Sequence, residues 1–149
     1  MKGIGSLSAM SSIASNQITL PTDAVQVIAQ HGYDCFPEEA CGLLVGHRET
    51  GVVVRAVPTT NDAHSAKVYT INPKEHLRAE LAAEADGLEV IGCFHSHTHT
   101  EAYPSPTDVA QAPDPDWHYI IVSLMREAPE VRAYRIVGDT ITEEVISTP

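Results

Sequence analysis

Two histidines separated by one residue, His95 and His97, are the strongest chemical signal in this sequence. They follow an apolar run, residues 90–94, which is typical of a buried strand. Because side chains two apart on a strand point to the same face, both imidazoles are expected to converge on one point. Converging neutral imidazoles are common metal ligands, so the pair predicts a metal site where this strand ends.

Asp108 is the candidate third ligand. Residues 105–108 are typical of a helix start, with Ser105 as N-cap, a proline at the first helical position and an acid three residues after the cap. A capping box worth about 1 kcal/mol would explain Ser105 and Asp108 on its own. If Asp108 also binds a metal, two histidines and one carboxylate leave a fourth position open, which is the mark of a catalytic zinc.

His99 and Cys93 offer two other ligand sets. An extended chain beyond His97 would add His99 to the same face and form a three-histidine site. The turn needed soon afterwards favours a His99 that faces a substrate cleft or solvent instead. Cys93, two residues before His95, could close a purely structural zinc site, although packing in the core is the commoner role of a cysteine on a buried strand.

A hydrolytic zinc site also needs a base that is not itself a ligand, and Glu39 is the candidate. It lies just before the apolar residues 40–46, where a buried carboxylate is costly unless it has a partner or a chemical role. A solvated pair of Glu38 and Glu39 at the start of a strand is the alternative. Sequence spacing alone does not separate the two interpretations.

Length and composition favour one domain without disulfides. The chain has 149 residues, 43% of them hydrophobic, and a chain of this size buries about two-thirds of its unfolded surface. We expect residues 1–16, which are serine-rich and lack the apolar core of a signal peptide, to be a flexible tail, and residues 17–149 to form a single domain.

The same composition bears on location and partners. Three unclustered cysteines, and apolar runs all well short of the roughly 20 residues of a membrane span, predict a cytoplasmic protein with reduced thiols. The net charge of −11 argues against nucleic acid or an anionic membrane as a partner.

The hydrophobic pattern predicts an α+β protein in which helices flank a mixed, mostly antiparallel sheet. Helices are expected from Pro21 to Gly32, from Lys74 to Asp86 and from Ser105 onward. The expected strands are residues 17–20, 40–46, 51–57, 67–71, 88–94, 117–124, 131–137 and 140–147.

The sequence resembles the JAMM (MPN+) metallopeptidases in two places. The first is residues 39–46, which begin with Glu39, and the second is the pair His95 and His97, followed after ten residues by Asp108. The resemblance covers essentially the whole domain. It implies the MPN fold, which is cytidine-deaminase-like, and a zinc-dependent peptidase. Carried over residue by residue, it implies that His95, His97 and Asp108 bind Zn²⁺, that Glu39 is the acid/base and that Ser105 stabilises the oxyanion.

Thr98 departs from the family pattern, which usually has proline after the second histidine. Residues 98–105 look most like the bacterial subgroup that cleaves cysteine from the C-terminus of a ubiquitin-like sulfur-carrier protein. The resemblance therefore implies hydrolysis of the amide bond after the carrier's C-terminal Gly-Gly, releasing cysteine for cysteine biosynthesis. The alternatives are an isopeptidase or processing protease for another ubiquitin-like tail, and a non-catalytic MPN binding module. The second is disfavoured because this chain keeps all five site positions.

Overall fold

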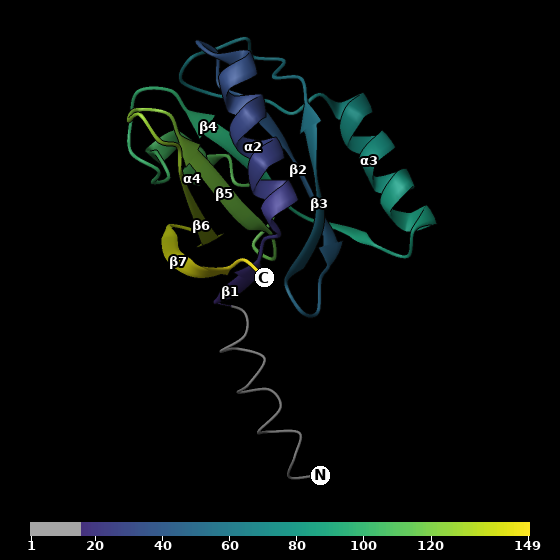
Figure 1. Ribbon diagram of the computed structural model, residues 1–149. Coiled ribbons are helices and arrows are strands. Elements are labelled where there is room, and N and C mark those ends of the chain that lie inside the picture. Colours follow the sequence, from purple (N-terminus) through teal and green to yellow (C-terminus); the bar gives the residue numbers. More distant parts are fainter. Residues whose placement is uncertain (1–15) are drawn as a thin grey trace.

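The computed structural model describes residues 16–149 of the chain (Figure 1). All but the last residue of the expected tail, residues 1–16, lies outside the described residues, so the division into a tail and a domain of residues 17–149 stays a prediction. The mixture of helices and strands confirms the expected α+β class. In chain order the elements are β1 (Gln17–Thr19), α2 (Thr22–Cys35), β2 (Cys41–His47), β3 (Val52–Thr59), α3 (Pro73–Ala85), β4 (Glu89–His97), α4 (Pro106–Ala110), β5 (His118–Ser123), β6 (Glu130–Val137) and β7 (Thr140–Ser147).

The strands form a mixed sheet that closes into a barrel in the order β1-β3-β2-β4-β5-β6-β7. β1 makes the closure, because it pairs in parallel with both β3 and β7. β4 and β5 are also parallel, and the remaining neighbours pair antiparallel. Parallel neighbours need a long crossover connection, and the chain between β4 and β5 provides one that contains α4.

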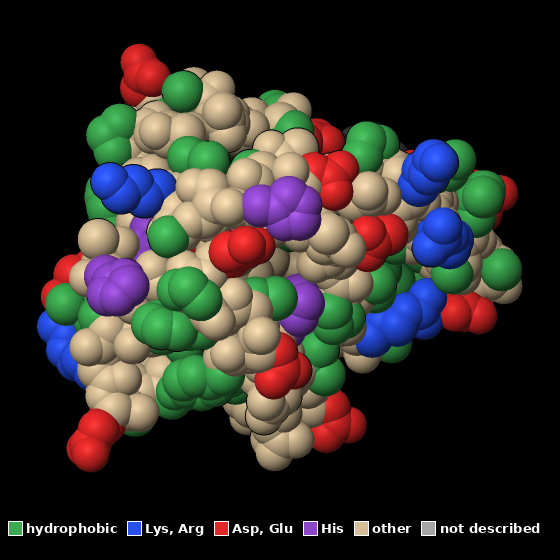
Figure 2. Space-filling view, turned by 90° about the horizontal axis from the view of Figure 1, so that it is seen from above, with side chains coloured by type: hydrophobic (Ala, Val, Ile, Leu, Met, Phe, Trp, Pro, Cys, Tyr) green, Lys and Arg blue, Asp and Glu red, His purple; other side chains and the backbone are tan. Residues whose placement is uncertain are grey.

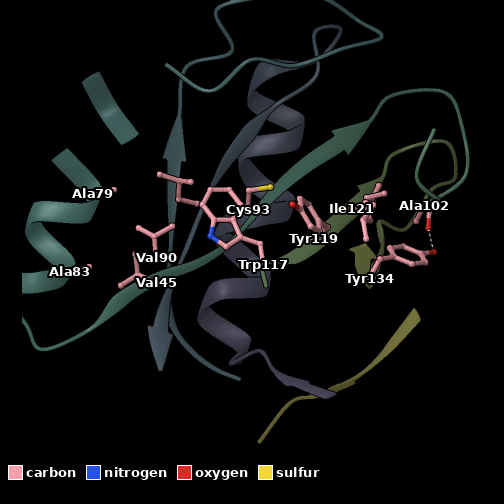
Figure 3. Close-up of a cluster of buried hydrophobic side chains, with 12 residues drawn as sticks. Val45, Ala79, Ala83, Val90, Cys93, Ala102, Trp117, Tyr119, Ile121 and Tyr134 are labelled. Atoms are coloured by element: carbon pink, nitrogen blue, oxygen red, sulfur yellow. Dashed lines mark hydrogen bonds between the residues drawn. The ribbon is translucent and has the colours of Figure 1, made fainter. Parts of the chain in front are cut away.

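Helices α2 and α3 bury opposite faces of β4. Phe94 belongs to a buried cluster with Ile28 of α2, whereas Cys93 belongs to a second cluster with Ala83 of α3 (Figure 3). Because alternate residues of a strand face opposite sides, the two histidines at the end of β4 lie on the same side as Cys93. No helix within residues 16–149 is long and apolar enough to cross a membrane.

Helix α2 runs past its expected end at Gly32 and finishes at Cys35. A Cβ built at Gly32 would meet Leu124 at 3.5 Å and Ser96 at 3.6 Å. This glycine therefore lies where the helix packs closely on the sheet, and it does not mark the end of the helix.

The strand expected at residues 67–71 does not form. Within the described residues, this segment makes one isolated antiparallel bridge, between Asn61 and Ile71. The buried Asn61 side chain takes over the hydrogen bonding: it donates to the Val68 carbonyl (3.0 Å) and accepts from the Thr70 N–H (2.9 Å). A side-chain amide thus replaces a strand partner.

The contact between β4 and β5 can be tested at Gly92. A Cβ at this position would lie 2.1 Å from the backbone oxygen of His118, so Gly92→Ala is expected to lower the free energy of unfolding by about 3 kcal/mol. Gly32→Ala is the matched control, because its contacts would be ordinary and alanine favours a helix by about 1 kcal/mol. Urea unfolding measures both variants, and equal stabilities would contradict the close approach of the two strands.

Candidate metal centre and active site

The two histidines and the aspartate meet where β4 ends. His95 Nε2 and His97 Nε2 are 3.1 Å apart, and they lie 3.2 Å and 3.0 Å from Asp108 Oδ2. All three side chains are buried. Along residues 16–149 this is the one group of His, Cys, Asp and Glu donors with the proximity needed to hold a metal ion.

The donor separations fit a tetrahedral ion. Bonds of about 2.0–2.1 Å to zinc place neighbouring ligand atoms about 3.4 Å apart, close to the 3.0–3.2 Å found here. His97 Nδ1 must donate to the carbonyl oxygen of Glu101 (2.7 Å), because that oxygen can only accept. Burial lowers the pKa of His97, but hydrogen bonds to Asp108 and to the Glu101 carbonyl raise it overall. A bound metal ion would take the place of the proton between Nε2 and the carboxylate.

Burial also suits His95 to metal binding. Removal from water lowers the pKa of the His95 imidazole, which keeps the ring in the neutral form that binds metals.

The start of α4 holds Asp108 in place through a capping box. Ser105 Oγ accepts from the Asp108 N–H (3.1 Å), and Asp108 Oδ2 accepts from the Ser105 N–H (2.9 Å). Burial alone would raise the pKa of Asp108, but hydrogen bonds from His95 and His97 hold it well below its usual range. One carboxylate oxygen therefore serves the helix cap and the donor group together.

The turn between β4 and α4 is anchored to the neighbouring strands. Ser123 Oγ of β5 donates to the Thr100 carbonyl (2.5 Å). The Tyr134 hydroxyl of β6 donates to the carbonyl of Ala102, as Figure 3 shows. These bonds fix the path by which the chain folds back to bring Asp108 over the end of β4.

Strand register brings Glu39 beside the histidines. The Ser96 N–H donates to the Ala40 carbonyl (3.0 Å), and Ser96 Oγ accepts from the Ala40 N–H (2.8 Å). These bonds continue the antiparallel pairing of β2 and β4 beyond the start of β2, and the same register sets Glu39 opposite His97. Glu39 is therefore not at a solvated strand entrance.

The Glu39 carboxyl is buried and largely unpartnered. The residue is 3% exposed, and Oε1 has no hydrogen-bond partner within the described residues. Burial raises the pKa of Glu39 to about 8; His97 opposes this shift and Asp108 adds to it. A carboxyl with a pKa near neutrality can both accept and return a proton.

A cleft of about 260 Å³ opens beside the donor group and is lined by Glu39, Ala66, Lys67, His97, Thr98, His99, Thr100 and Ser105. Ser105 Oγ accepts a hydrogen bond in the cap, which leaves its hydroxyl hydrogen free for a ligand. Figure 2 shows the molecule from the end at which these loops lie, with histidine side chains exposed at several places on this face. The five site residues expected from the sequence thus come together at one place.

His99 and Cys93 stay outside the donor group. His99 is exposed and lines the cleft, so the three-histidine ligand set does not form. Cys93 packs in the hydrophobic core, with its Sγ 3.7 Å from the hydroxyl of Tyr69. Neither residue closes the fourth position of a structural zinc site.

Tyr69 is a site residue that sequence reasoning missed. Its ring stacks on His95, with centroids 4.3 Å apart and an interplanar angle of 22°. Among residues 16–149, the buried His95 Nδ1 has no hydrogen-bond partner, although metal-binding histidines are usually oriented by a bond from that second nitrogen. Stacking on Tyr69 therefore orients this ring. The alternation of residues 67–71 predicted only a half-buried strand, and it did not indicate that Tyr69 contacts His95.

The chain is similar to several known proteins. Residues 21–137 match the family of prokaryotic homologs of the JAB domain, Prok-JAB. The chain is 39% identical over 132 residues to the CysO-cysteine peptidase of Mycobacterium tuberculosis, covering 87% of this chain and 90% of that protein. It is 32% identical over 138 residues to the desampylase of Haloferax volcanii, covering 88% of this chain and 96% of the relative.

Two solved structures share the fold. A Desulfitobacterium hafniense protein studied in solution matches with a TM-score of 0.82 at 34% identity, covering 89% of this chain and 92% of the other. A JAB1/MPN domain protein from Archaeoglobus fulgidus matches with a TM-score of 0.59 at 18% identity, covering 88% and 98%.

The chain therefore belongs to the Prok-JAB family and has the JAB/MPN fold. It is a peptidase, which confirms the enzyme class expected from the sequence.

The orienting role of Tyr69 can be measured through metal affinity. Tyr69→Ala is expected to weaken zinc binding at least about tenfold, the usual effect of losing a residue that orients a ligand. Tyr69→Phe keeps the stacked ring and should bind like the wild type. Competition with a chromogenic chelator gives the dissociation constants. Wild-type affinity in Tyr69→Ala would mean that stacking does not position His95.

Proposed function

We propose that this protein is a zinc-dependent peptidase that hydrolyses the amide bond after the C-terminal Gly-Gly of a ubiquitin-like sulfur-carrier protein and releases cysteine for cysteine biosynthesis. The observation that carries this proposal is a single cleft that is lined by Glu39 and Ser105 and borders the metal-donor group. The 39% identity to a CysO-cysteine peptidase supports the carrier-cysteine substrate. The free thiols of all three cysteines support a cytoplasmic setting.

Each site residue has a role in this reaction. His95, His97 and Asp108 would hold zinc, which when bound polarises the scissile carbonyl and lowers the pKa of the attacking water toward about 7. Glu39 accepts the proton of this water as it adds to the carbonyl carbon. The Ser105 hydroxyl donates to the carbonyl oxygen while negative charge develops there. When the C–N bond breaks, Glu39 returns the proton to the leaving amine.

An isopeptidase acting on another ubiquitin-like tail is the second candidate function. The 32% identity to a desampylase supports it. Both reactions use the same five residues and differ in the leaving amine, which is an α-amino group in one case and a lysine side chain in the other.

Metal content and cleavage test the proposed reaction together. The purified protein is expected to hold one zinc ion at the His95, His97 and Asp108 group. It should shorten a ubiquitin-like carrier ending in Gly-Gly-Cys by the mass of one cysteine, as mass spectrometry would record, and a chelator should abolish this cleavage. Bound zinc without cleavage would favour isopeptide-linked substrates. Failure to bind zinc even after reconstitution would overturn the metal centre.

The role of Glu39 is tested by Glu39→Gln. This change keeps the size of the side chain but removes its basicity, so zinc content should be unchanged and kcat should fall by about 10²–10⁴-fold. Glu38→Gln is the matched control, because Glu38 is the preceding residue and its side chain is 44% exposed. If Glu39→Gln turns over at the wild-type rate, another group is the base.

A further inference from the structure

Lys67 lines the same cleft as Glu39, together with His97 and His99. Lys67 is one of only nine lysines and arginines in a chain of net charge −11, so a cation here runs against the composition. Its backbone N–H is held by Ser65 Oγ (3.0 Å). Within residues 16–149 its ammonium group has no carboxylate partner, which leaves this charge free for a ligand.

His99 is held on two sides at the mouth of the cleft. Thr98 Oγ1 donates to the Ala66 carbonyl (3.4 Å), which can only accept, so it accepts from the Nδ1–H of His99 (2.9 Å). The ring of Phe36 packs against the imidazole with centroids 5.6 Å apart. With the ring hydrogen on Nδ1, Nε2 of His99 presents a lone pair, so Lys67, and not His99, is the side chain that donates to an anionic ligand.

The proton transfer by Glu39 indicates which part of the substrate lies in the cleft. Because Glu39 returns its proton to the leaving amine, the residue after the scissile bond must occupy the cleft that Glu39 lines. The cleft of about 260 Å³ is smaller than the roughly 300–1,000 Å³ of typical ligand pockets. It suits one amino acid better than a segment of a folded protein.

We propose that Lys67 binds the free α-carboxylate of the leaving residue, which makes the enzyme selective for a single C-terminal amino acid over an isopeptide-linked protein. This inference rests on the proposed peptidase function and adds the recognition of its leaving group. A product carboxylate is repelled by the acidic chain as a whole. The local cation Lys67 offsets that repulsion at the site.

Paired substrates that differ only in this carboxylate test the proposal. A ubiquitin-like carrier ending in Gly-Gly-Cys is prepared as the free acid and as the C-terminal amide, and the zinc-loaded enzyme is assayed on both. The wild-type kcat/KM is expected to be at least about tenfold higher for the acid, mainly because of a lower KM. The amide lacks the charged acceptor, and loss of a charged hydrogen bond has an effect of about this size. Lys67→Met should lower kcat/KM for the acid toward the value for the amide.

Matched variants and a binding measurement make the outcomes distinct. Lys67→Arg should restore the preference for the acid, and Lys74→Met, which removes an exposed lysine outside the cleft lining, should keep it. The Glu39→Gln protein, titrated calorimetrically with each carrier, should bind the acid more tightly. Equal cleavage and equal binding of acid and amide would overturn carboxylate recognition and leave the peptidase intact. Cleavage of neither carrier would overturn the proposed function itself, and this inference with it.

Discussion

The close approach of two imidazoles to one buried carboxylate oxygen, Oδ2 of Asp108, is the constraint on which the structure around the site depends. A carboxylate removed from water costs several kcal/mol unless its oxygens find partners. Here the partners are His95, His97 and the Ser105 N–H, at 2.9–3.2 Å. These partners come from the end of β4 and from the start of α4, so α4 must begin close to the point where β4 ends. The parallel pairing of β4 with β5 meets this need, because it forces the chain through a crossover that contains α4.

Glu39 shows how the environment separates two carboxyl groups in one site. Asp108 is surrounded by hydrogen-bond donors that keep it ionised. Glu39 is equally buried but has an unpartnered oxygen, and burial raises its pKa to about 8. Neighbouring groups whose pKa values are driven apart in this way divide the work: one keeps a fixed charge and the other carries a proton. Strand register makes the difference possible, since it sets Glu39 opposite His97 and not against the helix cap.

Local patterns in the sequence predict much of this arrangement. The same-face rule for His95 and His97 and the cap signal at Ser105 each depend on a few adjacent residues, and the structure places these side chains together. The approach of Glu39 to the histidines depends on pairing with a strand more than 50 residues away, which spacing does not encode. The cost of a buried carboxylate suggested Glu39 as the base, and the family resemblance decided for it. The closure of the barrel by β1 was not anticipated for the same reason, because a three-residue strand gives almost no signal of its partners.

The prediction of a strand at residues 67–71 was wrong for a different physical reason. Its alternating side chains match a half-buried strand, but periodicity reports only which faces are apolar, not which groups satisfy the backbone. Here the Asn61 amide supplies those hydrogen bonds. The chain is then free to leave the sheet and stack Tyr69 on His95. No pattern within the segment could reveal the contribution of one distant buried amide.

Thr98 is the site position at which this chain departs from its family pattern. Proline has no hydroxyl, whereas Thr98 Oγ1 contacts both the Ala66 carbonyl and His99 Nδ1. The substitution therefore joins the turn after β4 to the segment that carries Lys67, and it leaves the spacing of His95 and His97 unchanged. In the proposed reaction, metal binding and leaving-group recognition thus use separate residues that border one cleft. A change in the leaving group that the enzyme accepts would then require no change in the metal ligands.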